Sequence, residues 1–426
     1  MKLESSESTQ LTLLTPSRLA WIFLDWAASA FSAILITLVV TYVEKFAFSN
    51  GEWGVAGGVV WAWIIATTMF ASAIITPWLS AWADRKHAHQ NALLGAVLLG
   101  SIACFALAMT PTDWRFCIAV SIVLAGIGFE MGAVFAGSLL PRLASGPAAD
   151  RLSAAGFACG YAGGAIALIL ATSVVATRES FGLSLSGSLR VSFAIMGGWW
   201  FIFSLPAMFI PMGQHGTREH KGTSTAELLA FTQNVLLHQH GRHLRFVLIG
   251  SMLVIGAVQT AIAQFSSVAI EEFQMDPQKV VQLVLLVQFI ALPGALAVGW
   301  LSTNWNRHGA LVLCLTGWAT VLVLSWFIQT QPQLYALAGL LALVLGGIQS
   351  VIRATVATWA PEGHYGATFG LFQVGTKLAG CAASVAFGVL YALSGHPRAG
   401  LLALLVQLLI GWLVLRYAMP RTSRIE

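Results

Sequence analysis

The sequence predicts an all-α polytopic membrane protein with twelve transmembrane helices in two six-helix bundles. Charged residues make up only 9% of the 426 residues, and the apolar residues fall into about twelve blocks of helix length. A helix of about 20 apolar residues crosses the hydrocarbon core of a bilayer. Only helices and closed barrels satisfy their backbone polar groups there. The blocks are too long and too continuous for the alternating strands of a barrel.

Short polar turns, several with proline or glycine, separate the predicted spans. The spans cover residues 18–45, 57–82, 90–110, 115–141, 152–176, 190–212, 243–270, 279–302, 309–329, 333–359, 366–391 and 398–419. One long polar connector separates the first six from the last six. The predicted organisation is a tail (1–17), an N-terminal bundle (18–212), the connector (213–242), a C-terminal bundle (243–419) and a second tail (420–426).

The distribution of lysine and arginine predicts the orientation in the membrane. If the N-terminus is cytoplasmic, most basic residues outside the spans fall on the cytoplasmic side, where such residues are in excess. Both termini and the connector are therefore predicted to be cytoplasmic. The first 17 residues lack the basic region and cleavage site of a secretory signal, so the first helix is expected to be retained. The expected location is a bacterial inner membrane.

Several functional classes do not fit this composition. No polar segment is long enough for a catalytic or nucleotide-binding domain, and no nucleophile–base pair or phosphate-binding glycine loop is present. The five cysteines lie in apolar segments without metal-type spacing. The net charge of +5 follows from the loop bias and not from a basic patch on a soluble domain. We therefore expect no enzyme activity, no cofactor, no metal and no nucleic-acid partner.

A similar stretch follows the second helix of each predicted half. Trp82-Ala83-Asp84-Arg85-Lys86 follows the second span, and residues 300–307, WLSTNWNR, follow the eighth. Each stretch precedes a new apolar run. Duplicated halves with a substrate site near the midplane are typical of secondary transporters.

With these features the chain resembles the major facilitator superfamily, and within it the autophagy-type vacuolar amino-acid effluxer family and its bacterial relatives. The matching stretches, in order along nearly the whole chain, are DWAASAF at 25–31, ADR at 83–85, LLP at 139–141, RLS at 151–153, GYAGG at 160–164, VQT at 258–260, PGAL at 293–296, GGIQS at 346–350, FGLF at 369–372 and Lys377. The resemblance implies a transporter of amino acids or related metabolites that works by rocker-switch alternating access, usually as a monomer.

The chain departs from the family pattern where relatives usually have polar or acidic residues. Ala28 replaces an asparagine, and Ile255 and Gly256 replace an Asn-Asp pair. Residues 302–304, STN, replace a second Ala-Asp-Arg, and Arg142 stands where relatives tend to place an acid. The missing carboxylates leave open a non-transporting sensor or assembly factor on the same scaffold.

Ionisable and polar residues inside the spans are candidates for a functional pathway, because they are costly in a bilayer. Asp25 and Glu130 could bind substrate or load and release a proton, since desolvation raises the pKa of a carboxyl group. They could equally form fixed ion pairs with basic residues. The predicted substrate or proton pathway consists of Asp25, Glu130, Gln259, Gln349, Arg353 and Lys377.

The basic and amide residues of this set have two interpretations each. Arg353 and Lys377 could bind a carboxylate or phosphate group of a substrate, or they could neutralise the two acids. Gln259 and Gln349 could line the pathway, or they could form hydrogen bonds that pack helices together.

Asp84 and Arg85 are predicted to lie at a cytoplasmic turn and to act as a conformational gate. The resemblance implies that Asp84 caps a helix end in the opposite half and that Arg85 joins a charge network, which together latch the outward-facing state. An anion at a helix N-terminus is physically favourable. The alternative is a plain solvated turn. His87 and His89 follow without a third ligand, so they are expected to be solvated loop residues and not a metal site.

Together these features predict a secondary active transporter that exports a small solute with proton coupling. A pathway with both acidic and basic residues suits a zwitterion such as an amino acid, and an organic anion almost as well. A lipid or amphipathic-compound flippase of the same fold and a non-transporting sensor remain alternatives. The expected partners are the solute, the proton and the lipid bilayer, and the chain is expected to be a monomer.

Overall fold

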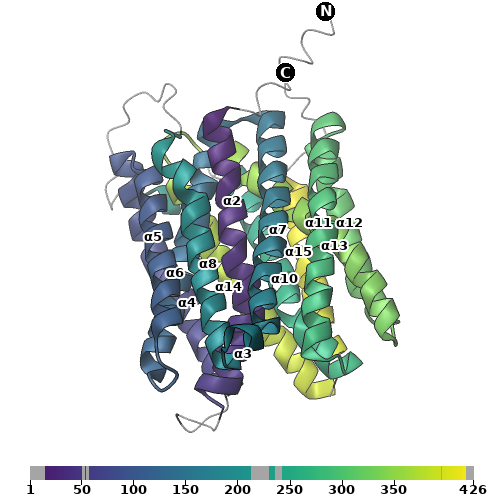
Figure 1. Ribbon diagram of the computed structural model, residues 1–426. Helices are drawn as coiled ribbons and strands as arrows, with labels where there is room; N and C mark the ends of the chain where they lie inside the picture. Colours follow the sequence, from purple (N-terminus) through teal and green to yellow (C-terminus); the bar gives the residue numbers. More distant parts are fainter. Residues whose placement is uncertain are drawn as a thin grey trace, which may run out of the picture. The chain divides into compact units, whose positions relative to one another are not determined.

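The computed structural model describes residues 15–49, 53, 57–212, 230–235, 242–394 and 396–418. Every labelled element in Figure 1 is a helix. Predictions about the two tails fall mostly on residues 1–14 and 419–426, which lie outside the described residues. The same holds for most of the connector, at 213–229 and 236–241, so the predicted domain boundaries stay predictions.

Among the described residues, twelve helices are long and apolar enough to cross a membrane. The first runs through α2 (Pro16–Ile34), η2 (Leu35–Val39), α3 (Val40–Tyr42) and η3 (Val43–Ala47), and is followed by α4 (Gly57–Lys86), α5 (His89–Met109), α6 (Arg115–Leu143), α7 (Gly146–Ala176), the short η5 (Arg178–Phe181) and α8 (Leu185–Phe209). The later ones are α10 (Arg242–Phe273), α11 (Pro277–Asn304), α12 (Arg307–Leu324), α13 (Gln331–Trp359), α14 (Tyr365–Ser394) and α15 (Pro397–Ala418). The predicted all-α fold with twelve spans is confirmed.

The surface of these helices is apolar where a soluble protein would be polar. Phe209 is 80% exposed and Leu393 is 81% exposed, and many other large apolar side chains share this exposure. Apolar surface of this extent is rare in monomeric soluble proteins. The chain is therefore an integral membrane protein whose outer helix faces meet lipid.

Arginine side chains satisfy the backbone carbonyls at several helix ends. Arg18 donates to Leu143 O at the end of α6, at 3.0 Å and 2.9 Å, and Arg115 donates to Ala47 O at 2.8 Å. Arg190 donates to the carbonyls of Ala108 and Met109 at the end of α5. The last four carbonyls of a helix have no partner within the helix, and a cation is favoured there.

Several helices extend beyond the predicted spans, and three of these extensions add the polar residues discussed below. α4 continues to Lys86. Asp84 and Arg85 were predicted to lie in a turn between helices, but they lie in the last turn of α4. α7 begins at Gly146, whose φ of 54° is a left-handed conformation, and Pro147 follows at a position that suits proline. α12 begins at Arg307, after the side chain of Asn306 accepts a hydrogen bond from Gly309 N at 2.5 Å. The prediction was based on apolar blocks, so it missed these extensions, because polar residues lie at these helix ends.

The described chain forms two compact units. Unit 1 comprises 1–79, 87–143 and 159–218, and unit 2 comprises 80–86, 144–158 and 219–426. In unit 2, the last turns of α4 and the first turns of α7 therefore pack with α10 to α15. This grouping brings the polar ends of α4 and α7 into the same unit as α11, α12, α13 and α14.

Glycine permits close helix packing within unit 2. A Cβ atom at Gly256 of α10 would lie 2.8 Å from both the Cβ of Ala379 and the backbone nitrogen of Gly380 in α14. Gln407 of α15 also donates to Leu253 O and Ala379 O, at 3.0 Å and 3.1 Å. The replacement of the family's acid by Gly256 thus has a packing reason, because any side chain at this position would separate α10 from α14.

We expect Gly256→Ala to lower the thermal unfolding temperature of the detergent-solubilised protein. Overpacking of this kind costs about 1–3 kcal/mol. The matched control is Gly95→Ala in α5, where an added Cβ would meet nothing within 4 Å. That substitution should leave the temperature unchanged or raise it, because alanine is favoured over glycine inside a helix by about 0.5–1 kcal/mol. Equal unfolding temperatures for the two variants would contradict the packing role.

Candidate functional site

The carboxylate of Asp84 caps the N-terminus of α14. Its two oxygens accept hydrogen bonds from Gly366 N at 3.0 Å and from Ala367 N at 2.8 Å. Asp84 is only 4% exposed, so it is not the solvated turn residue of the alternative interpretation. The first backbone N–H groups of a helix lack partners within the helix, and an anion is favoured there by the helix dipole. One carboxylate therefore joins the end of α4 to the start of α14.

Of the residues that follow Asp84, His87 lies as predicted and His89 does not. Arg85 is half-buried, and its part in a charge network stays a prediction. His87 is exposed, with a φ of 50°, as a loop residue should be. His89 was predicted to be solvated, and this is wrong. It is fully buried at the first position of α5, and its Nδ1 lies 2.9 Å from Ser138 Oγ of α6.

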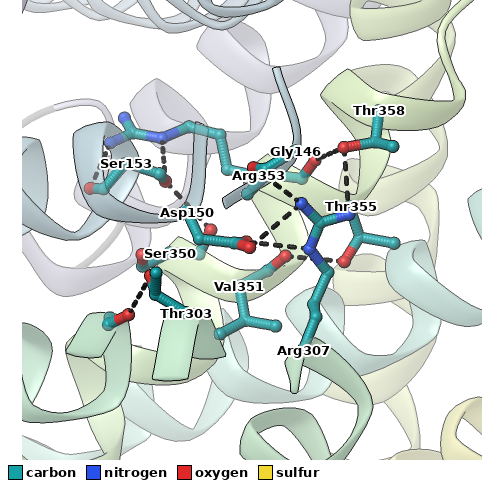
Figure 2. A network of polar contacts seen from close by, with 12 residues as sticks. Gly146, Asp150, Ser153, Thr303, Arg307, Ser350, Val351, Arg353, Thr355 and Thr358 are labelled. Atoms are coloured by element: carbon teal, nitrogen blue, oxygen red, sulfur yellow. Dashed lines mark hydrogen bonds and ion pairs between the residues drawn. The ribbon is translucent and has the colours of Figure 1, made fainter. Parts of the chain in front are cut away.

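A second polar contact joins α7 to the start of α12. Arg307 Nε donates to Asp150 Oδ1 at 2.8 Å, and Arg307 Nη2 donates to Asp150 Oδ2 at 3.0 Å. Figure 2 shows the carboxylate facing the guanidinium in this bidentate pair. Arg307 also donates to Gly146 O at 3.2 Å and to Thr358 Oγ1 at 2.9 Å. Asp150 is 4% exposed and Arg307 is 17% exposed.

Arg353 continues this group of contacts about one turn further along α7. Its Nε donates to Ser153 Oγ at 3.0 Å, and its Nη2 donates to Ser153 O at 2.9 Å (Figure 2). Ser153 Oγ in turn donates to Ser350 O at 2.9 Å. The guanidinium carbon of Arg353 lies 4.2 Å from the centroid of the Phe157 ring. Arg353 therefore holds α7 to α13 by hydrogen bonds and a cation–π contact.

We call this set of contacts the polar cluster. It consists of Asp84 with Gly366 and Ala367, Asp150 with Arg307, and Ser153 with Ser350 and Arg353. Its members come from the ends of α4 and α7 on one side and from α12, α13 and α14 on the other. The connections are charge-assisted or polar, and such bonds can break and be replaced by bonds to water. Apolar side chains that separate gain no such replacement contact from water.

Asp25 and Glu130 lie in unit 1, on α2 and α6, and both are half-buried. The face of α2 that carries Asp25 packs against α7. A Cβ atom at Gly160 would lie 2.7 Å from Ser29 Oγ and 3.3 Å from Asp25 O. Both acids take part in polar or electrostatic interactions.

The remaining predicted pathway residues lie in unit 2, and all are half-buried. Gln349 donates to Leu345 O of its own helix at 3.3 Å, and it has further interactions. Gln259 of α10 makes no hydrogen bond with another described residue. Lys377 of α14 takes part in interactions of its own. Among the predicted pathway residues, Arg353 donates hydrogen bonds to Ser153 of another helix, α7.

Asp150 and Arg307 were not predicted as site residues. The predicted spans ended at 141 and resumed at 152, so Asp150 fell in an assumed loop. Arg307 likewise fell between the spans 279–302 and 309–329. One signal was available in the sequence. Arg307 follows the eighth span much as Arg85 follows the second, although the acid of the first copy is missing from the second.

A model of the family described as vacuole effluxer Atg22 like matches residues 60–424. Among curated proteins, an uncharacterised MFS-type transporter YxiO of Bacillus subtilis is 24% identical over 407 residues, which is 95% of each chain. Autophagy-related protein 22 of Yarrowia lipolytica is 26% identical over 257 residues. This match covers 53% of the chain but only 43% of the fungal protein.

Solved structures of major facilitator transporters share the fold. The fucose:proton symporter FucP of E. coli has a TM-score of 0.73 at 13% identity, over 96% of this chain and 99% of that one. The human organic anion transporter MFSD10 has a TM-score of 0.71 at 13% identity, over 94% and 99%. These likenesses concern the fold alone. The family match over residues 60–424 establishes that the chain belongs to the vacuole effluxer Atg22-like family, and its fold is that of the major facilitator transporters above.

Proposed function

We propose that this transporter exports a small solute, an amino acid or a related metabolite, by rocker-switch alternating access coupled to protons. The polar cluster is the observation that carries the proposal. Alternating access requires contacts that hold one end of the helices closed and then separate. Asp84, Asp150 and Arg353 supply such contacts between the ends of α4 and α7 and the helices α12 to α14.

The pairing of Asp150 with Arg307 also bears on the missing family acids. The family's second Ala-Asp-Arg is replaced by STN at 302–304, which removes an acid near the start of α12. The acid of the pair comes from α7 instead, and its partner is Arg307. The proposed gate thus keeps a carboxylate contact at α12, where Asp150 pairs with Arg307, and at α14, where Asp84 accepts from backbone N–H groups. This supports transport over a non-transporting scaffold.

The charges of the pathway support a zwitterionic substrate. Asp25 and Glu130 supply carboxylates, and Lys377 and Arg353 supply cations, all of them half-buried. Lys377 and Arg353 are the candidates to bind a substrate carboxylate, and Arg353 also contacts Ser153 and Phe157. Asp25 is the better candidate for proton coupling, because Ser29 and Gly160 bring it to the interface between α2 and α7. Gln259 and Gln349 would complete the lining.

The proposal also covers the location of the protein, its oligomeric state and its orientation in the membrane. We propose a monomer in a bacterial inner membrane. Both termini would lie in the cytoplasm, because Arg85, Arg307 and most other basic residues would then face the cytoplasm. The polar cluster would close the cytoplasmic end of the pathway. Neither a lipid flippase nor a sensor is favoured by the similar proteins: YxiO is an MFS-type transporter and FucP is a symporter.

Asp25→Asn should abolish gradient-driven amino-acid accumulation in liposomes while counterflow exchange persists. An amide cannot load and release a proton, but it can keep the hydrogen bonds of a binding site. The measurement is uptake and release of a labelled amino-acid mixture under an imposed pH gradient. Glu179→Gln, at an exposed carboxylate, is the control and should behave as the wild type. Undiminished accumulation in Asp25→Asn would remove this residue from coupling, and no movement by the wild type would contradict an amino-acid substrate.

Asp84→Ala should open the end of the pathway that the polar cluster closes. Loss of a charged hydrogen-bond acceptor costs about 1.5–3 kcal/mol, so the open population should rise about tenfold or more. The reporter is Ser80→Cys, at a fully buried position of α4, in a background without the five native cysteines. Its rate of reaction with a maleimide reagent is measured. Lys86→Ala, at an exposed charge of the same helix, is the control. Equal rates in the two variants would show that Asp84 is no latch.

The pair of Asp150 and Arg307 should show strong coupling in a double-mutant cycle. Asp150→Asn or Arg307→Gln alone should destabilise the protein by about 3–5 kcal/mol, because each leaves a buried charge without its partner. The double variant should lose much less than the sum of the two. The same cycle on the exposed pair Arg178 and Glu179 should give about 0–1 kcal/mol. Additive losses in the thermal unfolding temperature at 150 and 307 would contradict a mutual contact.

A further inference from the structure

The start of α10 and the end of α15 form an exposed surface of arginine and aromatic side chains. Arg242 donates a hydrogen bond to the hydroxyl of Tyr417. Its guanidinium carbon lies 5.3 Å from the ring centroid of Tyr417 and 5.9 Å from that of Phe246. Arg245 lies 5.4 Å from the same Phe246 ring. We call these residues, together with the exposed Arg416 in the last turn of α15, the basic–aromatic patch.

The patch lies where two membrane helices leave the hydrocarbon. The apolar span of α10 begins at Arg242, and that of α15 ends at Ala418. Tyr417 is 60% exposed. Trp359, at the end of α13, is also exposed, and its ring stacks on His243 at a centroid distance of 6.1 Å. Tyrosine and tryptophan are enriched at the level of the lipid headgroups, so the patch is placed at that depth.

The sequence segments that carry the patch hold few acids, and Glu362 follows Trp359 by three positions. No aspartate or glutamate occurs from 228 to 270 or from 363 to 425. The first turn of α10 holds no acidic residue, although two arginines lie there. A basic surface at headgroup depth fits a negatively charged ligand.

We infer that the basic–aromatic patch binds the headgroup phosphate of an anionic phospholipid. A guanidinium fork matches two phosphate oxygens, and charge-assisted hydrogen bonds of this kind are the stronger ones. The rings of Phe246 and Tyr417 hold the guanidinium of Arg242 in place. The exposed Tyr417 ring lies beside the apolar part of the same lipid. This inference does not depend on the transported substrate, the direction of transport or proton coupling.

The expected strength follows from the number of arginines. A basic residue near an anionic membrane surface contributes about a fivefold increase in affinity. Neutralising Arg242, Arg245 and Arg416 together should weaken lipid binding on the order of 100-fold. The lipid would tie α10 to α15 at this end of unit 2, where Arg242 and Tyr417 already join the two helices.

The test compares three purified proteins by native mass spectrometry and by thermal shift in detergent. The patch variant is Arg242→Gln, Arg245→Gln and Arg416→Gln together. The matched control is Lys45→Gln, Arg178→Gln and Lys279→Gln, which removes the same charge from other helix ends. Each protein is titrated with dioleoylphosphatidylglycerol, with dioleoylphosphatidylcholine and with soluble glycerol 1-phosphate. The wild type and the control should prefer phosphatidylglycerol, and the patch variant should lose that preference.

Three outcomes would overturn the inference. The patch variant could bind phosphatidylglycerol as tightly as the wild type, the wild type could bind both lipids equally, or glycerol 1-phosphate could stabilise the wild type as much as the lipid does.

A second variant carries lysine at positions 242, 245 and 416. It should keep part of the preference for phosphatidylglycerol, because lysine retains the positive charge but lacks the forked guanidinium group. A lysine variant that binds no better than the glutamine variant would also contradict the inference.

Discussion

The exclusion of water from the hydrocarbon core is the constraint on which the rest of the structure depends. It forces every backbone polar group within the spans into helices, and it leaves the helix ends as the places where polar partners are needed. Arg18, Arg115 and Arg190 donate to carbonyls at such ends, and Asp84 accepts from backbone N–H groups at another. Many of the few charged residues of this chain therefore lie where helices begin and end.

The polar cluster uses the same chemistry for a different purpose. Within unit 2, Asp84 satisfies the start of α14, while Asp150 and Arg307 satisfy each other between α7 and α12. Buried ion pairs add little net stability compared with apolar packing, but removing one partner is costly. A contact of this kind specifies one arrangement of helices without making it permanent. This property suits the conformational gate that we propose for the cluster.

Packing accounts for one departure of the chain from its family. Gly256 cannot carry a side chain because Ala379 and Gly380 lie against it, and Gln407 joins the same two helices through their carbonyl groups. Loss of the acid at this position is therefore linked to the close approach of α10 and α14. Carboxylates remain at Asp25 and Glu130, in unit 1, so the chain retains acidic groups within its spans.

The sequence by itself determined the fold class, the twelve spans and the family, because continuous apolar blocks and ordered motifs are local properties of the chain. It also pointed to Asp84 as a residue for a helix end. Only the tertiary structure decided that Asp84 caps α14, that Arg353 binds Ser153, that His89 is buried, and that Asp150 pairs with Arg307. Polar residues at helix ends interrupt the apolar pattern and resemble loops. Their partners lie up to 283 positions away along the chain, and no local pattern records such pairings.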